Sequence, residues 1–580
     1  MKAFLHRLRT FAAEMRTRLA QSRIPGRYAF LIFGITAAFF VHLYNSYGLA
    51  SGAEEGGTRL LQSFLAPWVP HKGGPRDAIT VVVYDQASFD ALKIDVPVLP
   101  YDRQAQLLDR VAAMNPAAIF IDANYKRDLS DPEGLKAFLS TVTRLRAAGT
   151  HVYIGEVKPA RPATSTDTFF NDTSQSPFDR LRAAAKDKTT GFETGTLRNI
   201  DRSLDYPAET ARLLAAAGDT TLIQTPAFRL YDDLCDPHRA SSENSISRAE
   251  LRCEGLPSPR PPLAIQWLSY DAARGPTSAA MGDGDNPACR RSAFATLAAD
   301  VAHNVFRKPA REAGYVYNPC VYLRTVKLDT VLDAADLDAI RPNFQGKVVM
   351  IGSNLGDDSF VAPGQGKVPG VFLHAMALEN LLAYGNAYHR WPPELPVLGG
   401  SINVDFFLEL ALALLANVAA RNVERRFAEK EVPEGAASER SQLRVYFVTA
   451  LCLSLLFGTV AMLVTYFVLH WTPVNALSIT LAALTVAGLE KYHELLVVAK
   501  TWSPAGILAV LITGALVAWL VLSLFITNDV ADPYRADHGM IWASGLVLAA
   551  WTAVLIYAYR AACIAVLRAI PAIFKYAGWR

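Results

Sequence analysis

Six polar residues follow three apolar runs of the sequence, and their side chains could bind a cation or a polar ligand. Each run has the length and composition of a buried strand. In a parallel sheet the carboxyl ends of the strands meet at one edge, where open α/β sheets bind ligands. Carboxylates at such an edge could also act as general acids or bases. The six residues are Asp85, Asp122, Asn124, Ser353, Asp357 and Asp358.

These residues also have a purely structural interpretation. Acidic and small polar side chains after strands cap helices and fasten loops without any ligand. The sequence leaves both interpretations open. We expect His374, near the start of a helical segment, to pack or to hydrogen-bond rather than to bind a metal.

Motifs of known enzyme classes are missing. The sequence contains no phosphate-binding Gly-x4-Gly-Lys-Ser/Thr, no His-Glu-x-x-His and no Gly-x-Ser-x-Gly. We therefore predict a protein that is not an enzyme, with no catalytic residues and no cofactor.

The elements that position the six residues indicate an α/β domain. Strand-like runs at 79–84, 117–121 and 151–155 alternate with helical segments, and Gly346–Leu382 has the pattern strand, loop, amphipathic helix. We predict a mainly parallel sheet flanked by helices, with a long insertion at about 160–320. Within the insertion we expect a strand at 221–225 and helices near 207–217 and 292–307.

Six apolar segments are long enough to be membrane helices. We predict an all-α transmembrane region and place the α/β domain, 50–395, between the first and second spans. The predicted spans are 28–49, 397–420, 445–470, 474–490, 504–527 and 540–559.

The distribution of basic residues predicts the orientation. With the N-terminus inside, the internal segments hold 19 Lys and Arg, whereas the short external turns hold only Arg535. Both termini are then cytoplasmic, and residues 50–395 lie in the periplasm of a bacterial inner-membrane protein. The cytoplasmic segments are 1–27, which has amphipathic helical spacing, the loops 421–444 and 491–503, and the tail 560–580.

Charge argues against a nucleic-acid partner. Residues 50–395 hold 37 Lys and Arg against 41 Asp and Glu, without the clustered basic footprint of a nucleic-acid surface.

Four cysteines lie in the predicted periplasmic domain, where oxidation favours disulfides. Three pairings are possible. The local pairing would join Cys235 to Cys253 and Cys289 to Cys320, and each bond would contribute about 3 kcal/mol in the chain-entropy model.

Asp405 and Glu409 lie four residues apart in the second predicted span, so they share one helical face. Intramembrane carboxylates are costly and suggest a proton or ion path or an interhelical contact. Alternatively, both residues lie in the headgroup zone near the outer end of the span.

Several segments resemble the second type of CHASE domain, an extracytoplasmic sensory domain of bacterial receptors. They are Val81–Phe89, Pro100–Arg103, Pro116–Asp122, Phe344–Ser353 and Pro369–Ala375. The resemblance implies a ligand-sensing α/β domain, and family members commonly signal to a cytoplasmic cyclase or kinase. Only about 21 residues follow Tyr559, too few for such a domain, so we expect the output to lie in the membrane region or in a partner.

Together these features predict a membrane-anchored receptor that binds a ligand or an envelope partner and relays the signal to a separate protein. The partners we expect are membrane lipids, another membrane or cytoplasmic protein, and a second copy of the chain. One alternative is a scaffold subunit of an envelope complex. Another is a transporter or channel component that uses Asp405 and Glu409.

Overall fold

The fold is described by a computed structural model, in which two compact units can be followed. The α/β unit comprises Arg59–Trp391 with His470–Thr472, and the helical unit includes Pro392–Leu469. The described residues are 74–94, 99–122, 132–158, 189–193, 205–213, 220–236, 251–267, 322–354, 359–362, 366–397, 400–428 and 436–472, with Thr58, Leu61, Gln62, Ile479 and Ala483.

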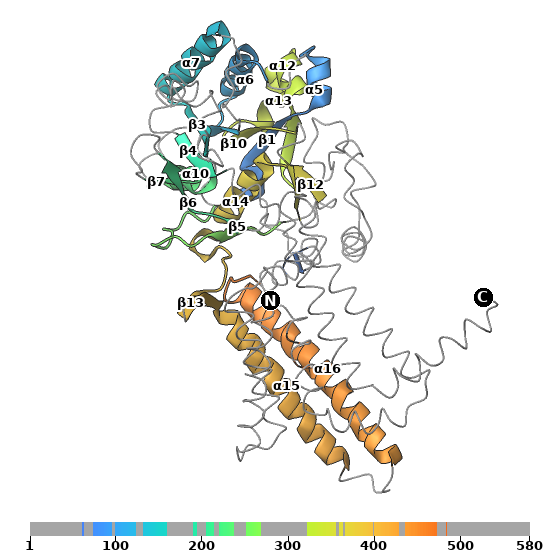
Figure 1. The fold of residues 1–580 in the computed structure, drawn as a ribbon. Helices are drawn as coiled ribbons and strands as arrows, with labels where there is room; N and C mark the ends of the chain where they lie inside the picture. The colour runs from blue at the N-terminus through green and yellow to red at the C-terminus, as the bar shows by residue number, and fades with distance from the viewer. Residues whose placement is uncertain are drawn as a thin grey trace, which may run out of the picture. The chain divides into compact units, whose positions relative to one another are not determined.

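The centre of the α/β unit is a six-stranded sheet in which every neighbouring pair is parallel (Figure 1). Its three central strands, Ala118–Asp122, Val348–Ser353 and Ile79–Tyr84, are mostly apolar because both faces of the sheet are covered. The structure thus confirms the predicted α/β class with a parallel sheet. In order across the sheet, the strands are β4 (Thr189–Glu193), β3 (His151–Lys158), β2 (Ala118–Asp122), β10 (Val348–Ser353), β1 (Ile79–Tyr84) and β9 (Arg324–Lys327).

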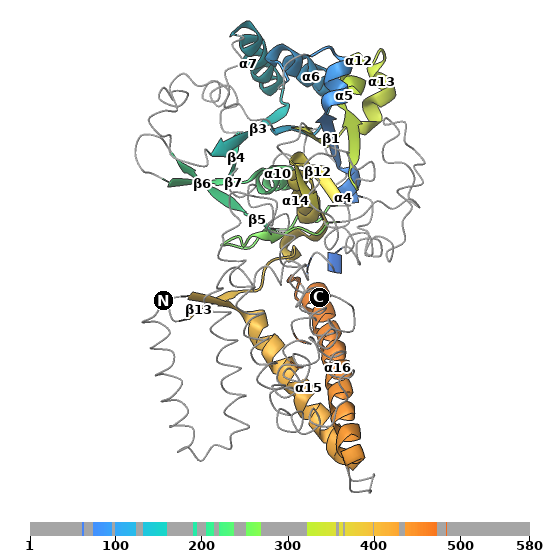
Figure 2. The ribbon, with the colours of Figure 1, turned by 45° about the vertical axis from the view of Figure 1, so that its right-hand side comes forward.

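Helices cover both faces of this sheet (Figures 1 and 2). One face packs against α5 (Gln86–Ala91), α6 (Tyr101–Ala113), α7 (Pro132–Ala147) and α12 (Leu328–Asp333). The other packs against α10 (Pro226–Cys235) and α14 (Val371–Tyr384). Shorter elements of the unit are α4 (Gly74–Asp77), α13 (Leu337–Ile340), the 3-10 turns η10 (Arg341–Asn343) and η11 (Gly385–Ala387), and the hairpin β11 (Ser359–Ala362) with β12 (Gly366–Pro369).

The helices that connect the strands change from one face of the sheet to the other at β10. Strand β10 lies between β1 and β2 in the sheet. The helices that follow β1 and β2 lie on one face, whereas α14, which follows β10, lies on the opposite face. The carboxyl end of β10 is therefore a topological switch point, which is the place where open α/β sheets bind ligands.

Helix α14 is buried on all sides. We predicted an amphipathic segment, but every residue from Val371 to Leu382 is buried. One side packs against the sheet, and other sides meet α10 and residues 251–267 of the insertion. The apolar residues on one face of this helix therefore account for only part of its buried surface.

Part of the insertion forms small sheets rather than the predicted helix. The segment predicted as a helix near 207–217 instead contains β6 (Glu209–Leu213), which pairs with β7 (Thr220–Gln224). The strand predicted at 221–225 corresponds to β7. The pair β5 (Asp205–Tyr206) and β8 (Leu263–Ala264) forms another two-stranded sheet, and the helix expected near 292–307 lies outside the described residues.

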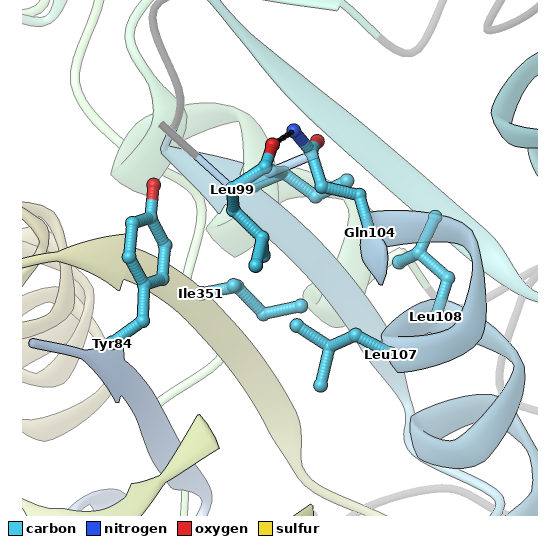
Figure 3. Close-up of a pocket in the computed structure, with 7 residues that line it drawn as sticks. Tyr84, Leu99, Gln104, Leu107, Leu108 and Ile351 are labelled. Carbon is cyan, nitrogen blue, oxygen red and sulfur yellow. Dashed lines mark hydrogen bonds between the residues drawn. The ribbon is translucent and has the colours of Figure 1, made fainter. Parts of the chain in front are cut away.

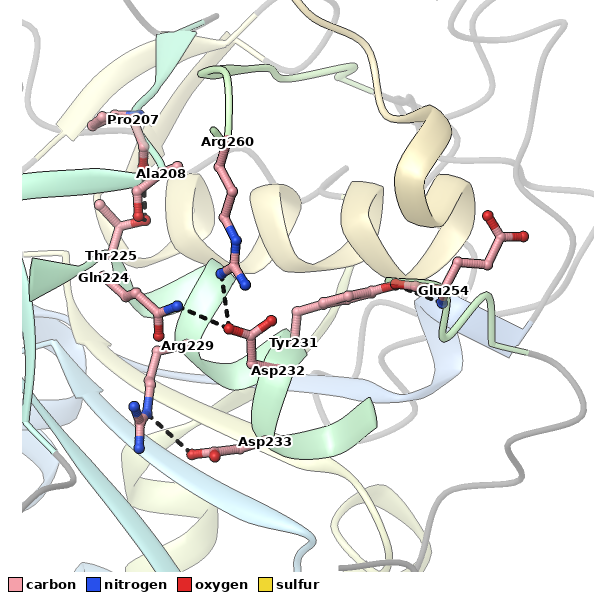
Figure 4. Close-up of polar contacts among 10 residues, drawn as sticks. All are labelled: Pro207, Ala208, Gln224, Thr225, Arg229, Tyr231, Asp232, Asp233, Glu254 and Arg260. Carbon is pink, nitrogen blue, oxygen red and sulfur yellow. Dashed lines mark hydrogen bonds and ion pairs between the residues drawn. The ribbon is translucent and has the colours of Figure 1, made fainter. Parts of the chain in front are cut away.

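Residues 251–267 form a strap that is fastened to α10 (Figure 4). The hydroxyl of Tyr231 lies 2.7 Å from the carbonyl oxygen of Arg252 and accepts a hydrogen bond from the Glu254 amide at 3.0 Å. Arg260 Nη1 contacts Asp232 Oδ2 at 2.8 Å. Cys235, the last residue of α10, forms a disulfide with Cys253. This confirms the Cys235–Cys253 part of the local pairing, whereas Cys289 and Cys320 lie outside the described residues.

Removing this disulfide should destabilise the α/β unit. The bond closes a loop with a sequence separation of 18, for which the chain-entropy model gives up to about 3 kcal/mol. We expect Cys235→Ser to lower the free energy of unfolding by that order, measured by urea titration of the full chain in detergent. Cys452→Ser, which removes an exposed free thiol, is the matched control. Equal stability of the two variants would contradict this role for the disulfide.

The helical unit begins with a hairpin, β13 (Glu394–Val397) and β14 (Gly400–Asn403). Two long helices follow, α15 (Val404–Ala428) and α16 (Ala436–Phe467). Val397 and Gly400–Asn403, placed at the start of the second predicted span, thus belong to these two strands. Among the described residues one segment, Val445–Phe467, is long and apolar enough to cross a membrane.

Asp405 and Glu409 are both buried in the first turns of α15. Farther along this helix Asn417 donates to the carbonyl oxygen of Ala483 at 3.0 Å and accepts from the Tyr446 hydroxyl at 3.1 Å. These polar contacts fix the packing of α15 within the helical unit. The predicted spans 28–49, 504–527 and 540–559 lie outside the described residues, as does all of 474–490 except Ile479 and Ala483.

Candidate functional site

Three of the six predicted site residues can be placed, and they lie at the carboxyl edge of the sheet. Asp85 follows β1, Asp122 ends β2, and Ser353 ends β10. Ser353 is paired in register with Tyr84, and Gly352 with Asp122, so the three strand ends are neighbours. The other three residues, Asn124, Asp357 and Asp358, lie outside the described residues.

Asp85 has a structural role in this edge. It is the N-cap of α5, and its Oδ1 accepts a hydrogen bond from the amide of Ser88 at 2.8 Å. A side-chain acceptor at the N-cap satisfies a helix amide that has no partner within the helix. The Asp85 carboxylate therefore caps a helix, which is the structural interpretation that the sequence left open.

Asp122 instead faces a buried histidine. Its Oδ2 lies 3.8 Å from Nε2 of His374, which belongs to the first turn of α14. The side chain of Asp122 is 19% exposed and that of His374 only 1%. Asp122 can thus be reached from solvent, whereas His374 cannot.

Tyr206 completes this cluster. Its hydroxyl lies 2.8 Å from Nδ1 of His374 and accepts a hydrogen bond from the amide of Ala227 at 3.1 Å. Because a carboxylate faces Nε2, the tautomer with its proton on Nε2 is favoured. The Tyr206 hydroxyl then donates to Nδ1.

Aromatic rings enclose the imidazole. Phe120 of β2 meets His374 edge-on with ring centroids 5.4 Å apart, and Tyr206 does so at 5.6 Å. This burial lowers the pKa of His374 to about 3 and raises the pKa of Tyr206. His374 is therefore neutral at physiological pH, so its contact with Asp122 is that of a neutral imidazole with a carboxylate and not an ion pair.

Gly352 allows α14 to approach the sheet at this point. A Cβ atom on Gly352 would lie 2.4 Å from Cβ of Val371, the first residue of α14. Such a distance is impossible for real side chains, so only glycine fits here without movement of the strand or the helix. The close packing sets the position of the first turn of α14, which carries His374.

A small cavity lies beneath the same edge on the opposite face of the sheet (Figure 3). It has a volume of about 10 Å³, and Gln104, which lines it, donates to the carbonyl oxygen of Leu99 at 2.7 Å. A space of this size holds no more than one water molecule. The other lining residues are Tyr84, Leu99, Leu107, Leu108, Ile121 and Ile351.

The far end of α14 is hydrogen-bonded to the strap. Asn380 accepts from the amide of Gln266 at 2.7 Å and donates to its carbonyl oxygen at 3.1 Å. Gln62 in turn donates to the carbonyl oxygen of Ile265 at 2.9 Å. A single buried helix therefore connects His374 to the strap and to the segment at Gln62.

Sequence reasoning found Asp122 but not its partners. Tyr206 lies in a two-residue strand of the insertion, where no periodic pattern indicated a buried residue. His374 was expected to pack or hydrogen-bond, and it does both in the structure. Among the described residues no group of three or more His, Cys, Asp and Glu side chains could hold a metal ion.

In open parallel α/β sheets, a switch point at the carboxyl edge is the place where ligands bind. The comparison with protein families is more specific. The CHASE2 domain family matches residues 36–404, more than half of the chain, and the chain belongs to this family of sensory domains. No curated protein and no solved structure matches the sequence.

Proposed function

We propose that this protein is a membrane-anchored extracytoplasmic sensor. The α/β unit binds a ligand or an envelope partner at the carboxyl edge of its sheet and passes the signal to a separate protein. One observation carries the proposal: Asp122, partly exposed at the switch point, faces His374 on a helix whose other end is tied to the strap. Membership of the CHASE2 family supports it.

In this proposal the ligand acts through α14. A group that binds Asp122 changes the charge facing His374, and His374 belongs to a helix with no exposed side along Val371–Leu382. Packed interiors do not deform locally without moving neighbours. A displacement at the first turn of α14 is therefore transmitted to Asn380 and the strap.

The proposed membrane region keeps six spans, with both termini in the cytoplasm of a bacterial cell and 50–395 in the periplasm. The apolar segment Val445–Phe467 supports one of these spans and leaves His470, the last residue of the predicted span 445–470, just beyond it. The arginine-rich segment 421–444 and the tail 560–580 are the proposed contact surfaces for the output protein. The segment was predicted as a loop, but its ends belong to α15, which continues to Ala428, and to α16, which begins at Ala436. The chain acts without catalysis and without a cofactor.

A scaffold subunit of an envelope complex is the second candidate. The near-complete burial of His374 and the small size of the cavity favour it, because a docking module needs no ligand-sized pocket. In that case the carboxyl edge would bind a protein surface.

Purification from the native membrane in mild detergent, followed by mass spectrometry, tests the sensor against the scaffold. A sensor should retain a small molecule or a substoichiometric output protein, and deletion of 421–444 should remove that protein. A stable particle of several proteins that survives the deletion, with no small molecule, would contradict the sensor and favour the scaffold.

A further inference from the structure

A short segment after α16 is part of the α/β unit. The amide of Arg390 donates to the carbonyl oxygen of His470 at 3.0 Å, and the amide of Thr472 donates to that of Arg390 at 2.9 Å. Arg390 and Trp471 thus form a parallel β-bridge. The ring of His470 also meets that of His389, with centroids 5.3 Å apart.

The position of this segment in the chain fixes its depth in the proposed membrane arrangement. Only Val468 and Leu469 separate His470 from the apolar segment that ends at Phe467. Three residues extend at most about 10 Å, and each headgroup layer is about 5–8 Å thick. If α16 crosses the bilayer, as the proposed function requires, His470 and the paired Arg390 lie at the headgroup layer.

Two tryptophans at this level agree with that placement. Trp391 follows Arg390, and Trp471 follows His470, and both are only partly buried. Tryptophan is enriched at membrane interfaces because its ring is apolar and its N–H is polar.

Positive charge converges on the same point. Arg252 is held beside the end of α14 because its amide donates to the carbonyl oxygen of Leu382 at 2.9 Å. Burial and the charges of Arg252 and Arg390 lower the pKa of His470, so both guanidinium groups act on one imidazole. None of the ion pairs among the described residues involves either arginine, although the exposed Glu254 lies on the same strap.

We propose that Arg252, Arg390 and His470, flanked by Trp391 and Trp471, form a docking surface for the phosphate of an anionic phospholipid headgroup. A guanidinium group binds phosphate oxygens through paired, charge-assisted hydrogen bonds. A bound phosphate would offset the repulsion between the positive charges of the two arginines. The lipid would then bind the α/β unit at the point where the chain leaves α16.

Lipid cross-linking on the full-length protein tests this surface. The chain is reconstituted into vesicles that contain a photoactivatable phosphatidylglycerol or the matching phosphatidylcholine, and labelled peptides around 384–393 and 467–475 are quantified. We expect preferential labelling by phosphatidylglycerol and a loss of about fivefold for each of Arg252→Gln and Arg390→Gln. Arg103→Gln, on α6, should leave the labelling unchanged.

Two failures are distinguishable. If the wild-type chain does not float with the vesicles, α16 does not anchor it, and both the proposed function and the docking surface are overturned. If the chain floats but these peptides show no preference for phosphatidylglycerol, or if the two variants label like the wild type, only the docking surface is overturned.

Discussion

Acidification from pH 6.5 to pH 4 should lower the free energy of unfolding of the α/β unit by about 3 kcal/mol through His374 alone. Burial holds the pKa of this imidazole at about 3 in the folded state, against an ordinary value of 6.5 when unfolded. Below pH 6.5 the unfolded chain therefore takes up a proton that the folded chain refuses. The contribution of neutral His374 to the free energy of unfolding is fully present above pH 6.5. It falls by about 1.4 kcal/mol per pH unit below that pH, until the folded pKa is reached.

The measurement is a series of urea titrations of the full chain in detergent between pH 7 and pH 4. His374→Asn keeps a polar group toward Tyr206 but cannot titrate, so the variant should lose this part of the pH dependence. His151→Asn, at the start of β3, should retain the wild-type slope. If His374→Asn shows the same slope as the wild type, His374 is not the buried neutral base described above.

Replacing Gly352 by alanine should cost more than about 3 kcal/mol, because the new methyl group cannot be accommodated by a side-chain rotation. It would lie 2.4 Å from Cβ and 2.7 Å from Cγ1 of Val371. Strand β10 is an inner strand of the sheet, and α14 is buried on every side, so neither backbone can move freely. Overpacking in cores usually costs 1–3 kcal/mol when side chains can adjust, and here the clash involves atoms fixed to the backbone.

Two variants sharpen this prediction in the same urea titration. Gly255→Ala is the control, since a Cβ at Gly255 meets nothing within 4 Å, and it should change stability by less than about 0.5 kcal/mol. Adding Val371→Gly to Gly352→Ala removes the clashing side chain and should recover part of the loss. A single Gly352→Ala variant as stable as the wild type would contradict the close packing of β10 and α14.

The sequence was most informative where a pattern is local. The runs that became β1, β2 and β10 are apolar, short and followed by polar residues, and this was enough to predict a parallel sheet and to select its carboxyl edge. The pattern could not separate Asp85, which caps a helix, from Asp122, which faces His374. Both residues follow a strand, and their roles depend on contacts made elsewhere in the fold.

Long-range partners account for what the sequence did not predict. Tyr206 and His374 are 168 residues apart, and Tyr206 lies in an insertion whose small sheets leave little periodicity to detect. The helix predicted near 207–217 was wrong because its alanine-rich sequence has high helix propensity, which is a weak signal beside strand pairing. The full burial of α14 likewise depends on α10 and the strap, neither of which is adjacent to it in the sequence.

The central claim is that the carboxyl edge at Asp122 is the sensing site, and the most direct test compares what the protein retains with and without this carboxylate. Wild-type protein, Asp122→Asn and Asp338→Asn are purified from native membranes in mild detergent, and bound molecules are identified by native mass spectrometry. Asp338 is an exposed carboxylate on α13, which precedes β10 and is thus remote from its carboxyl end. We predict a molecule or protein that the wild type and Asp338→Asn retain and Asp122→Asn loses; equal retention by all three would contradict the account.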